Sequence, residues 1–364
     1  MKFISNIIKI IAVIIGTLIG AGFASGKEIY IFFAQYGKNG LLGAIISSVL
    51  TASIIYSTIL IVKKYKVTNN NEFVEQITNN QKITILLKNI INIFLIVSFL
   101  IMCAGFCTFF KQEFKVPIIA TAIINAAIIY FLLIKNIDGI VKLNLIVVPI
   151  MIVIIVIISI KNYPMTNILN SNINTSTRNA GKAILDSILY TSYNSITLIP
   201  ILISPALNID NKKSLKIITI VSGCVILVLI IAIYQMLTLC TINVSNIEMP
   251  ILEILNECHP IEKIMYSIAI ITAILTSAIS SGYGVLENIK DKSKYKKIAL
   301  IICILEIPIS YVGFGNLVSV LYPAFGIIGI IQIVSILKKA NSIAKNSKNW
   351  YKLYKKKFVN HDKF

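Results

Sequence analysis

The sequence has 364 residues, of which 57% are hydrophobic and 13% are charged. Soluble domains carry about 25% charged residues, so this composition excludes an ordinary soluble protein and predicts an integral membrane protein. The net charge of +19 would suit a nucleic-acid binder, but the lysines lie between apolar runs, so we expect no nucleic acid. The six cysteines form no C-x-x-C pair and no cluster with histidine, which argues against a disulfide framework and a zinc site.

Ten apolar runs divide the chain, and runs of about 20 apolar residues can cross a bilayer. The first run lacks a small-residue cleavage signature and is longer than a signal peptide, so we expect it to be retained. The predicted spans are 4–36 (broken in the middle), 39–62, 83–110, 117–134, 139–160, 183–205, 215–241, 261–288, 296–312 and 315–337. We therefore expect one all-α transmembrane domain over 1–337 and a Lys-rich tail over 338–364.

The basic residues predict the orientation of these spans. With the N-terminus inside, 26 of the 34 basic residues fall on the inner side, as expected for cytoplasmic segments. An odd number of spans would scramble this distribution. The sequence thus predicts a multi-pass protein of the cell membrane with both termini in the cytoplasm, whose tail holds the orientation and touches anionic lipid.

The stretch from Gly16 to Glu28 departs from an ordinary span, because four glycines occur between Gly16 and Gly26. Each glycine weakens a helix by about 1 kcal/mol relative to alanine. Non-helical backbone at membrane depth is tolerated only where it lines a protein-enclosed or watery cavity, so this stretch is the first candidate for a binding site. The alternative is a glycine face for close helix packing, with Gly20 and Gly26 at loosely helical spacing.

A polar and aromatic patch lies within the span 183–205, which ends at Pro200 and Pro205. Its members are Asp186, Ser187, Tyr190, Thr191, Ser192, Tyr193, Asn194 and Ser195. Interrupted spans at matching positions of two halves indicate an inverted-repeat transporter. We expect repeats over about 4–160 and 183–337, with helices 1 and 6 interrupted. The alternative is a hydrogen-bonded core patch in one intact helix.

Four hydroxyl groups lie within six residues of the span 261–288, at Thr276, Ser277, Ser280 and Ser281. Thr276 and Ser280 share a helix face by their i, i+4 spacing. A sodium ion needs several oxygen ligands, and two hydroxyls together with carbonyls freed by a broken helix would provide them. The alternative is that these hydroxyls bond back to carbonyls of their own helix.

Three motifs resemble those of the YkvI family of bacterial membrane proteins. They are Gly16–Ile29 (GTLIGAGFASGKEI), Tyr190–Asn194 (YTSYN) and Thr276–Gly284 (TSAISSGYG). More distantly, the pattern is similar to the LeuT-type transporters of the amino acid–polyamine–cation superfamily. That resemblance implies ten helices in a five-plus-five inverted repeat, with the first and sixth helices broken.

The LeuT-type resemblance also implies a sodium site between the first and eighth helices. Its pattern Ala-x-x-Thr-Ser matches Ala273, Thr276 and Ser277 in this sequence. Aligning the first-helix glycines adds the carbonyls of Gly16 and Ile19. The carried-over ligands are thus three backbone carbonyls and two hydroxyls. We expect no transition metal.

For the solute, the resemblance and the glycine break place free N–H groups at Gly20, Ala21 and Gly22, at the positive end of a half-helix that suits a carboxylate. Phe23 would form an apolar wall. It also falls where the family's other sodium site has an asparagine, so we expect no second sodium. The side chains that would face an amino group or side chain of the solute are Thr191, Ser192, Tyr193 and Asn194.

Ionisable residues within spans are functional candidates. Lys27 and Glu28 either pair with each other or contact the solute or a gate. Glu306, before a proline in the span 296–312, is a candidate proton site, with helix-end packing as the alternative. Lys142 lies near the inner end of its span, and its role is left open.

We therefore expect a secondary active transporter that moves a small organic solute, such as an amino acid, coupled to sodium or protons and without a further cofactor. A ligand-sensing receptor of the same fold, such as a spore germinant receptor subunit, is the alternative. An enzyme is disfavoured because no span holds a catalytic pair such as serine with histidine. The segment Asn246–Glu262, with four glutamates, predicts a short external helix over the mouth of a cavity.

Overall fold

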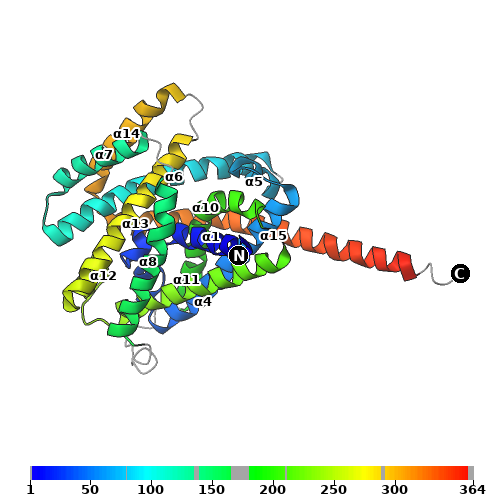
Figure 1. Ribbon diagram of the computed structural model, residues 1–364, viewed down its shortest axis with the longest axis horizontal. Helices are drawn as coiled ribbons and strands as arrows, with labels where there is room; N and C mark the ends of the chain where they lie inside the picture. The colour runs from blue at the N-terminus through cyan, green and yellow to red at the C-terminus, as the bar shows by residue number, and fades with distance from the viewer. Residues whose placement is uncertain are drawn as a thin grey trace.

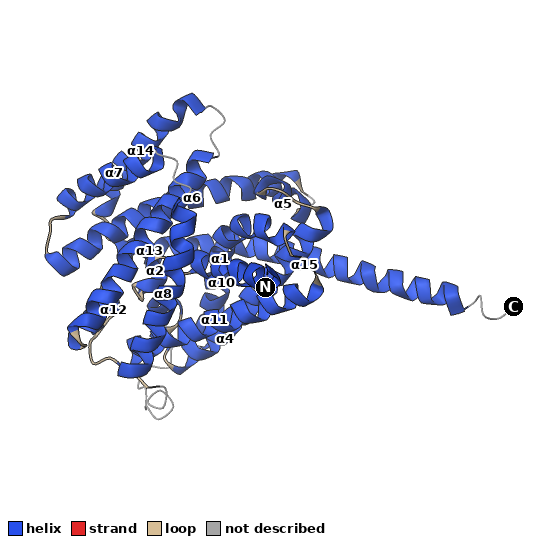
Figure 2. Ribbon diagram, viewed as in Figure 1, coloured by secondary structure: helices blue, strands red, loops and turns tan. Residues whose placement is uncertain are grey.

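The computed structural model describes residues 2–78, 80–134, 139–164, 180–209, 211–287 and 292–359. Every regular element in these ranges is a helix (Figure 2), which confirms the all-α class. By length and composition, six of these helices can cross a membrane: α4 (Lys38–Tyr65), α6 (Gln81–Phe114), α10 (Ala180–Leu207), α11 (Lys212–Leu239), α13 (Pro260–Glu287) and α15 (Phe314–Val359).

Shorter helices complete the bundle. They are α1 (Lys2–Leu18), α2 (Ala21–Ala24), α3 (Lys27–Phe32), α5 (Asn70–Ile77), α7 (Ile118–Ile134), α8 (Gly139–Asn162), α12 (Pro250–Ile254) and α14 (Tyr295–Ser310), with the 3-10 turns η1 (Ala34–Tyr36), η2 (Leu255–Glu257) and η3 (Lys292–Lys294). Each predicted span after the first overlaps one helix. The last helix, α15, continues past the predicted domain end at 337 and projects from the bundle (Figure 1).

The first predicted span is broken where the glycines occur, as the sequence predicts. The ladder of α1 ends with Ile19 N–H donating to Ile15 O at 2.9 Å, and the next bond runs from Ala24 N–H to Gly20 O at 3.0 Å. Gly26 then adopts a φ of 81°, a left-handed conformation that suits glycine. The last carbonyls of α1 therefore have no helical donor.

The sixth predicted span is not interrupted, so that prediction was wrong. The helix α10 runs without a break through Pro200 and Pro205. Several of its polar side chains bond to carbonyls of their own helix: Ser187 Oγ donates to Ala183 O at 2.8 Å, and Asn194 Nδ2 donates to Tyr190 O at 3.0 Å. These bonds satisfy the polar side chains without opening the backbone, so an intact helix with a hydrogen-bonded core patch was the correct alternative.

Small residues let α15 approach the polar part of α10 closely. A Cβ atom placed on Gly326 would lie 2.8 Å from Leu189 O, and one placed on Gly329 would lie 2.5 Å from Ser192 O. Such close backbone approach is typical of helix packing in membranes. It places α15 against the face of α10 that carries Leu189 and Ser192.

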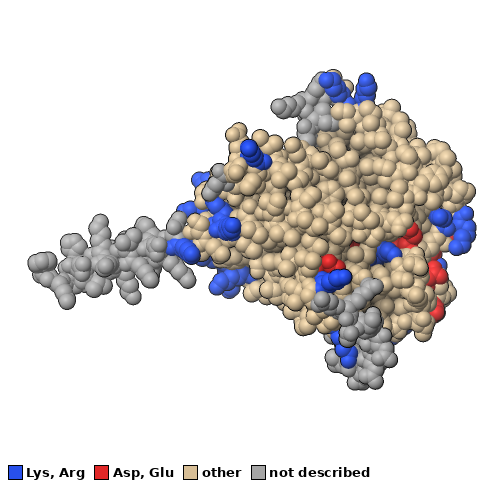
Figure 3. All heavy atoms as spheres, turned by 180° about the vertical axis from the view of Figure 1, so that it is seen from behind, with Lys and Arg blue, Asp and Glu red and all other residues tan. Residues whose placement is uncertain are grey.

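The outer surface is that of a protein in a lipid bilayer. Large apolar side chains are exposed along α7 and α14, among them Ile123 (55%), Phe131 (63%) and Ile304 (53%). On the face seen in Figure 3, a broad uncharged area separates the charged side chains that gather towards the edges. Residues 165–179, between α8 and α10, lie outside the described residues.

Candidate functional site

The break in the first span lies against α13. A Cβ atom placed on Gly20 would lie 3.9 Å from Ser277 Oγ and 3.7 Å from the methyl carbon of Met102. Gly16 lies in the last turn of α1, and Ile19 follows directly after that helix. The structure thus brings the hydroxyl of Ser277 to the break, next to the end of α1.

The neighbouring hydroxyl of α13 is bonded within its own helix. Thr276 Oγ1 donates to Thr272 O at 2.8 Å and lies 3.2 Å from Ala273 O. A hydroxyl that donates its single hydrogen keeps lone pairs for a cation. Thr276 thus follows the alternative weighed from the sequence, a hydroxyl bonded back to its own helix, with lone pairs left on Oγ1.

On its other side the break encloses the carboxyl group of Glu28, which is 3% exposed. A Cβ atom placed on Gly22 would lie 2.6 Å from Glu28 Oε2 and 3.2 Å from Cε2 of Tyr322. The Tyr193 hydroxyl donates to Glu28 Oε1. A carboxyl group of the protein therefore lies at Gly22, beside the backbone that we expected to receive a carboxylate of the solute.

Aromatic rings from three helices enclose this carboxyl group. Tyr193 stacks on Tyr322 of α15 with ring centroids 4.6 Å apart, and on Phe32 of α3 at 5.5 Å. Tyr190 contacts Tyr193 edge-on at 5.7 Å, and its buried hydroxyl has no hydrogen-bond partner among the described residues. The side chains of Asn194 and Tyr190 also face the carboxyl group. These groups form an aromatic box around Glu28.

The other members of the predicted solute site point elsewhere or line the core. Thr191 Oγ1 lies 3.1 Å from Ser187 O of its own helix and 3.2 Å from Ser47 Oγ of α4. Ser192 Oγ donates to Ile188 O at 2.7 Å, on the side that α15 covers. Phe23 is buried in the hydrophobic core at 2% exposure. Of the four α10 residues predicted to face the solute, Tyr193 and Asn194 lie at the break.

Lys27 does not pair with Glu28. Its Nζ donates to the carbonyls of Ser245 and Ile247, both at 2.9 Å, on the segment between α11 and α13. Glu28 takes part in no ion pair among the described residues. The two adjacent ionisable groups therefore have different partners. Glu28 lies at the break, whereas Lys27 anchors a segment outside it.

That segment, residues 245–257, is called the strap here, and it contains α12 as the sequence predicts. Ile251 N–H donates to Ser25 O at 3.0 Å, and Ile251 fills the space beside Gly26, where a Cβ atom would lie 2.6 Å from Ile251 Cγ1. The Glu248 carboxylate accepts a bond from Gly315 N–H at the start of α15. The strap thus joins the break to the N-terminal end of α15.

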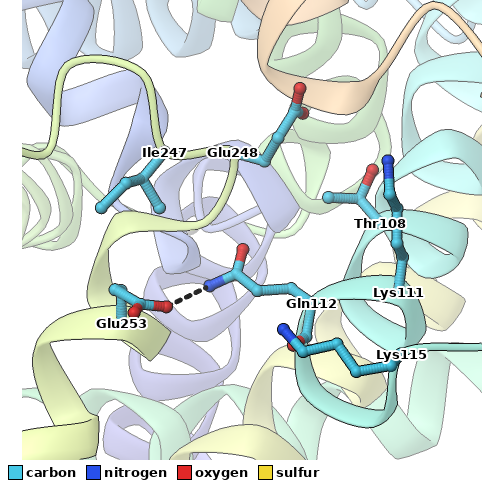
Figure 4. Close-up of a pocket in the computed structure, with 7 residues that line it drawn as sticks. All are labelled: Thr108, Lys111, Gln112, Lys115, Ile247, Glu248 and Glu253. Atoms are coloured by element: carbon cyan, nitrogen blue, oxygen red, sulfur yellow. Dashed lines mark hydrogen bonds between the residues drawn. The ribbon is translucent and has the colours of Figure 1, made fainter.

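A pocket of about 550 Å³ lies beside the strap (Figure 4). Its lining residues are Thr108, Lys111, Gln112, Lys115, Ile247, Glu248 and Glu253. Gln112 of α6 holds the strap from this side, since its Nε2 lies 3.3 Å from Met249 O and 3.4 Å from Glu253 Oε2. Gln112 could not be singled out from the sequence, because a lone polar residue at a helix end can have many roles.

Glu306, the other candidate proton site, lies away from the break. It is buried in α14 and accepts a bond from Asn125 Nδ2 of α7 at 2.9 Å. Lys142 belongs to the first turn of α8, and its side chain is outside the described part of the structure. No group of three histidine, cysteine or acidic side chains that could hold a metal ion occurs among the described residues.

The fold is similar to the folds of two membrane transporters of known structure. It superposes on a manganese transporter of Eremococcus coleocola with a TM-score of 0.61 and 11% identity, covering 93% of this chain and 80% of that one. It also superposes on a Na⁺-coupled sialic acid symporter in a substrate-bound outward-open state, with a TM-score of 0.54, 14% identity, and coverage of 92% and 77%. At these identities the likeness concerns the fold alone.

In sequence, the chain is similar to YkvI, an uncharacterised membrane protein of Bacillus subtilis (strain 168). The two are 24% identical over 344 residues, which cover 90% of this chain and 94% of YkvI. This confirms the resemblance to the YkvI family that the three motifs indicated. No protein-family model matches the chain.

Proposed function

We propose that this protein is a secondary active transporter for a small organic solute that carries a basic amino group, such as an amino acid or a related amine. The observation that supports this is the broken first span, which faces Ser277 on one side and encloses Glu28 on the other. In the proposal, ten spans form two inverted repeats, and these halves alternate access around the break.

Glu28 is the reason to expect an amino group on the solute. The carboxyl group is buried without a cation of the described protein beside it, so a positively charged ligand would relieve the cost of its burial. Aromatic faces, such as those of Tyr193 and Tyr322, attract an ammonium group through their π-systems. A carboxylate on the same solute would bind the free N–H groups of Gly20 and Ala21, further from Glu28.

Sodium is the coupling ion in this proposal. The carbonyls of Gly16, Ile19 and Ala273, with the hydroxyls of Thr276 and Ser277, supply five neutral oxygens. Binding there would join α13 to the end of α1 and favour one state of the transport cycle, because a ligand shifts the equilibrium towards the state that it binds better. A proton carried by Glu28 is the rival driving ion.

A thermal-shift screen of the purified protein against amino acids and amines, with and without sodium, tests this function. A ligand that binds the native state raises the melting temperature in proportion to its occupancy. We expect a solute whose shift increases with sodium, and we expect Thr276→Ala with Ser277→Ala to remove the sodium dependence. Manganese is included as a separate addition, because one structural neighbour transports it.

The matched control is Ser280→Ala, which removes an exposed hydroxyl from the same helix. It should keep the full sodium response. A sodium response that survives in the double variant would contradict the sodium site, whereas a solute response that follows pH instead of sodium would assign the coupling to a proton.

A further inference from the structure

A second carboxyl group is buried where α14 packs against α7 and α6, a contact that Figure 1 shows at one end of the bundle. Glu306 is 0% exposed and Asn125 is 1% exposed. Asn125 Nδ2 donates to Glu306 Oε1 at 2.9 Å. The other oxygen of each group, Glu306 Oε2 and Asn125 Oδ1, is buried and has no partner among the described residues.

The surroundings of Glu306 do not suit a charged carboxylate. The titratable groups that face it are the thiols of Cys103 and Cys107 from α6 and of Cys303 from its own helix. The ion pairs of the described chain involve other glutamates. Beyond this contact, α7 and α14 expose apolar side chains such as Ile124 and Leu305. A carboxylate held there by the Asn125 amide and by the weak thiol donor of Cys103 is strongly disfavoured.

One proton would satisfy both unpartnered oxygens. A neutral carboxyl group has one O–H donor as well as an acceptor, whereas a carboxylate only accepts. An amide presents a donor and an acceptor on the same carbon, and the bond from Asn125 Nδ2 to Glu306 Oε1 already joins the two groups. A hydrogen on Glu306 Oε2 would be donated to Asn125 Oδ1, which otherwise lacks a donor.

We propose that Glu306 is a proton-binding site in which the neutral acid and the Asn125 amide form a closed pair with two hydrogen bonds. The proton is taken from water as the chain folds and remains bound. The pair joins α14 to α7 without burying a charge. This site is separate from the break and does not rest on the proposed function.

The variant Glu306→Gln tests the pair, because glutamine reproduces the neutral acid and not the carboxylate. Its Oε1 accepts from Asn125 Nδ2, and its Nε2 donates to Asn125 Oδ1. We expect its melting temperature to match that of the wild type, and we expect Glu306→Ala and Asn125→Leu to lower it by several degrees. Glu75→Gln, at an exposed glutamate of α5, is the control.

Infrared spectroscopy of the full chain in lipid, labelled with ¹³C at glutamate carboxyls, reads the proton directly. In a Glu28→Gln background we expect a protonated-carboxyl band at neutral and mildly alkaline pH that disappears with Glu306→Gln. The proposal is overturned if the wild-type and Glu28→Gln proteins lack that band. It is equally overturned if Glu306→Gln destabilises the protein as much as Glu306→Ala does.

Discussion

Glu28 and Glu306 are both buried carboxyl groups in membrane-spanning segments, yet they lie in different kinds of structure. Glu306 faces an amide on an intact helix, and a single hydrogen bond already fixes their relative positions. Glu28 faces a break in the backbone, a tyrosine hydroxyl and three aromatic rings. The comparison indicates that an acid beside a continuous helix holds two helices together, whereas an acid beside a broken one is available to a ligand.

Among the variants that test this comparison, Glu28→Gln should have the largest effect, which is on the affinity for the solute. It removes the charge that would bind an amino group, and hydrogen bonds to charged groups contribute about 1.5–3 kcal/mol. We expect the affinity for the solute to fall about 10- to 100-fold, with the melting temperature of the ligand-free protein little changed. Calorimetric titration of the solute found in the thermal-shift screen measures the loss. Unchanged affinity would show that Glu28 does not contact the solute.

The substitution Gly22→Ala should destabilise the break. The added Cβ atom would lie 2.6 Å from Glu28 Oε2 and 3.2 Å from Cε2 of Tyr322, and the buried Glu28 side chain has little room to move away. Such overpacking typically costs about 1–3 kcal/mol. Gly20→Ala is the matched control, because its Cβ atom would be at ordinary contact distances of 3.7 and 3.9 Å. Melting temperatures of the two variants check the prediction. Equal values would mean that Glu28 does not lie against Gly22.

Two tyrosines of α10 should give the smallest of these effects, which is a change in stability. Tyr193→Phe removes a hydroxyl that donates to Glu28, and a typical hydrogen bond contributes about 0.5–1.5 kcal/mol. Tyr190→Phe removes a buried hydroxyl that faces the Glu28 carboxyl group without a well-formed hydrogen bond, so it should lower stability less than Tyr193→Phe does. Denaturation in detergent compares the variants. A larger loss for Tyr190→Phe would reverse the assignment of the two hydroxyls.

The break in the first span was predictable because its cause is local. Glycines such as Gly20 and Gly26 weaken a helix whatever surrounds it, and few residues other than glycine readily adopt the left-handed φ of Gly26. The strap was also indicated, since Ile251 and its apolar neighbours followed a short helical pattern between glutamates. Both features depend on residues close together in the sequence.

The intact α10 and the partners of the ionisable residues could not be predicted in the same way. Ser187, Ser192 and Asn194 of α10 bond within their own helix, and the sequence alone does not distinguish this outcome from a break in the helix. Asn125 and Glu306 meet although 181 positions separate them. Lys27 and Glu28 are adjacent, but their partners, Ser245 and Tyr193, come from distant segments. Such pairings follow from packing rather than from local pattern.

The most direct test of the central claim is uptake into proteoliposomes. A pool of radiolabelled amino acids is presented to the wild-type protein with an inward sodium gradient, and the same measurement is made without the gradient. We expect at least one amino acid to accumulate above its external concentration, a sodium ionophore to abolish this accumulation, and Glu28→Gln to lack it. Accumulation by Glu28→Gln at the wild-type level would show that the solute does not need Glu28. No accumulation by the wild type would contradict sodium-driven transport of an amino acid.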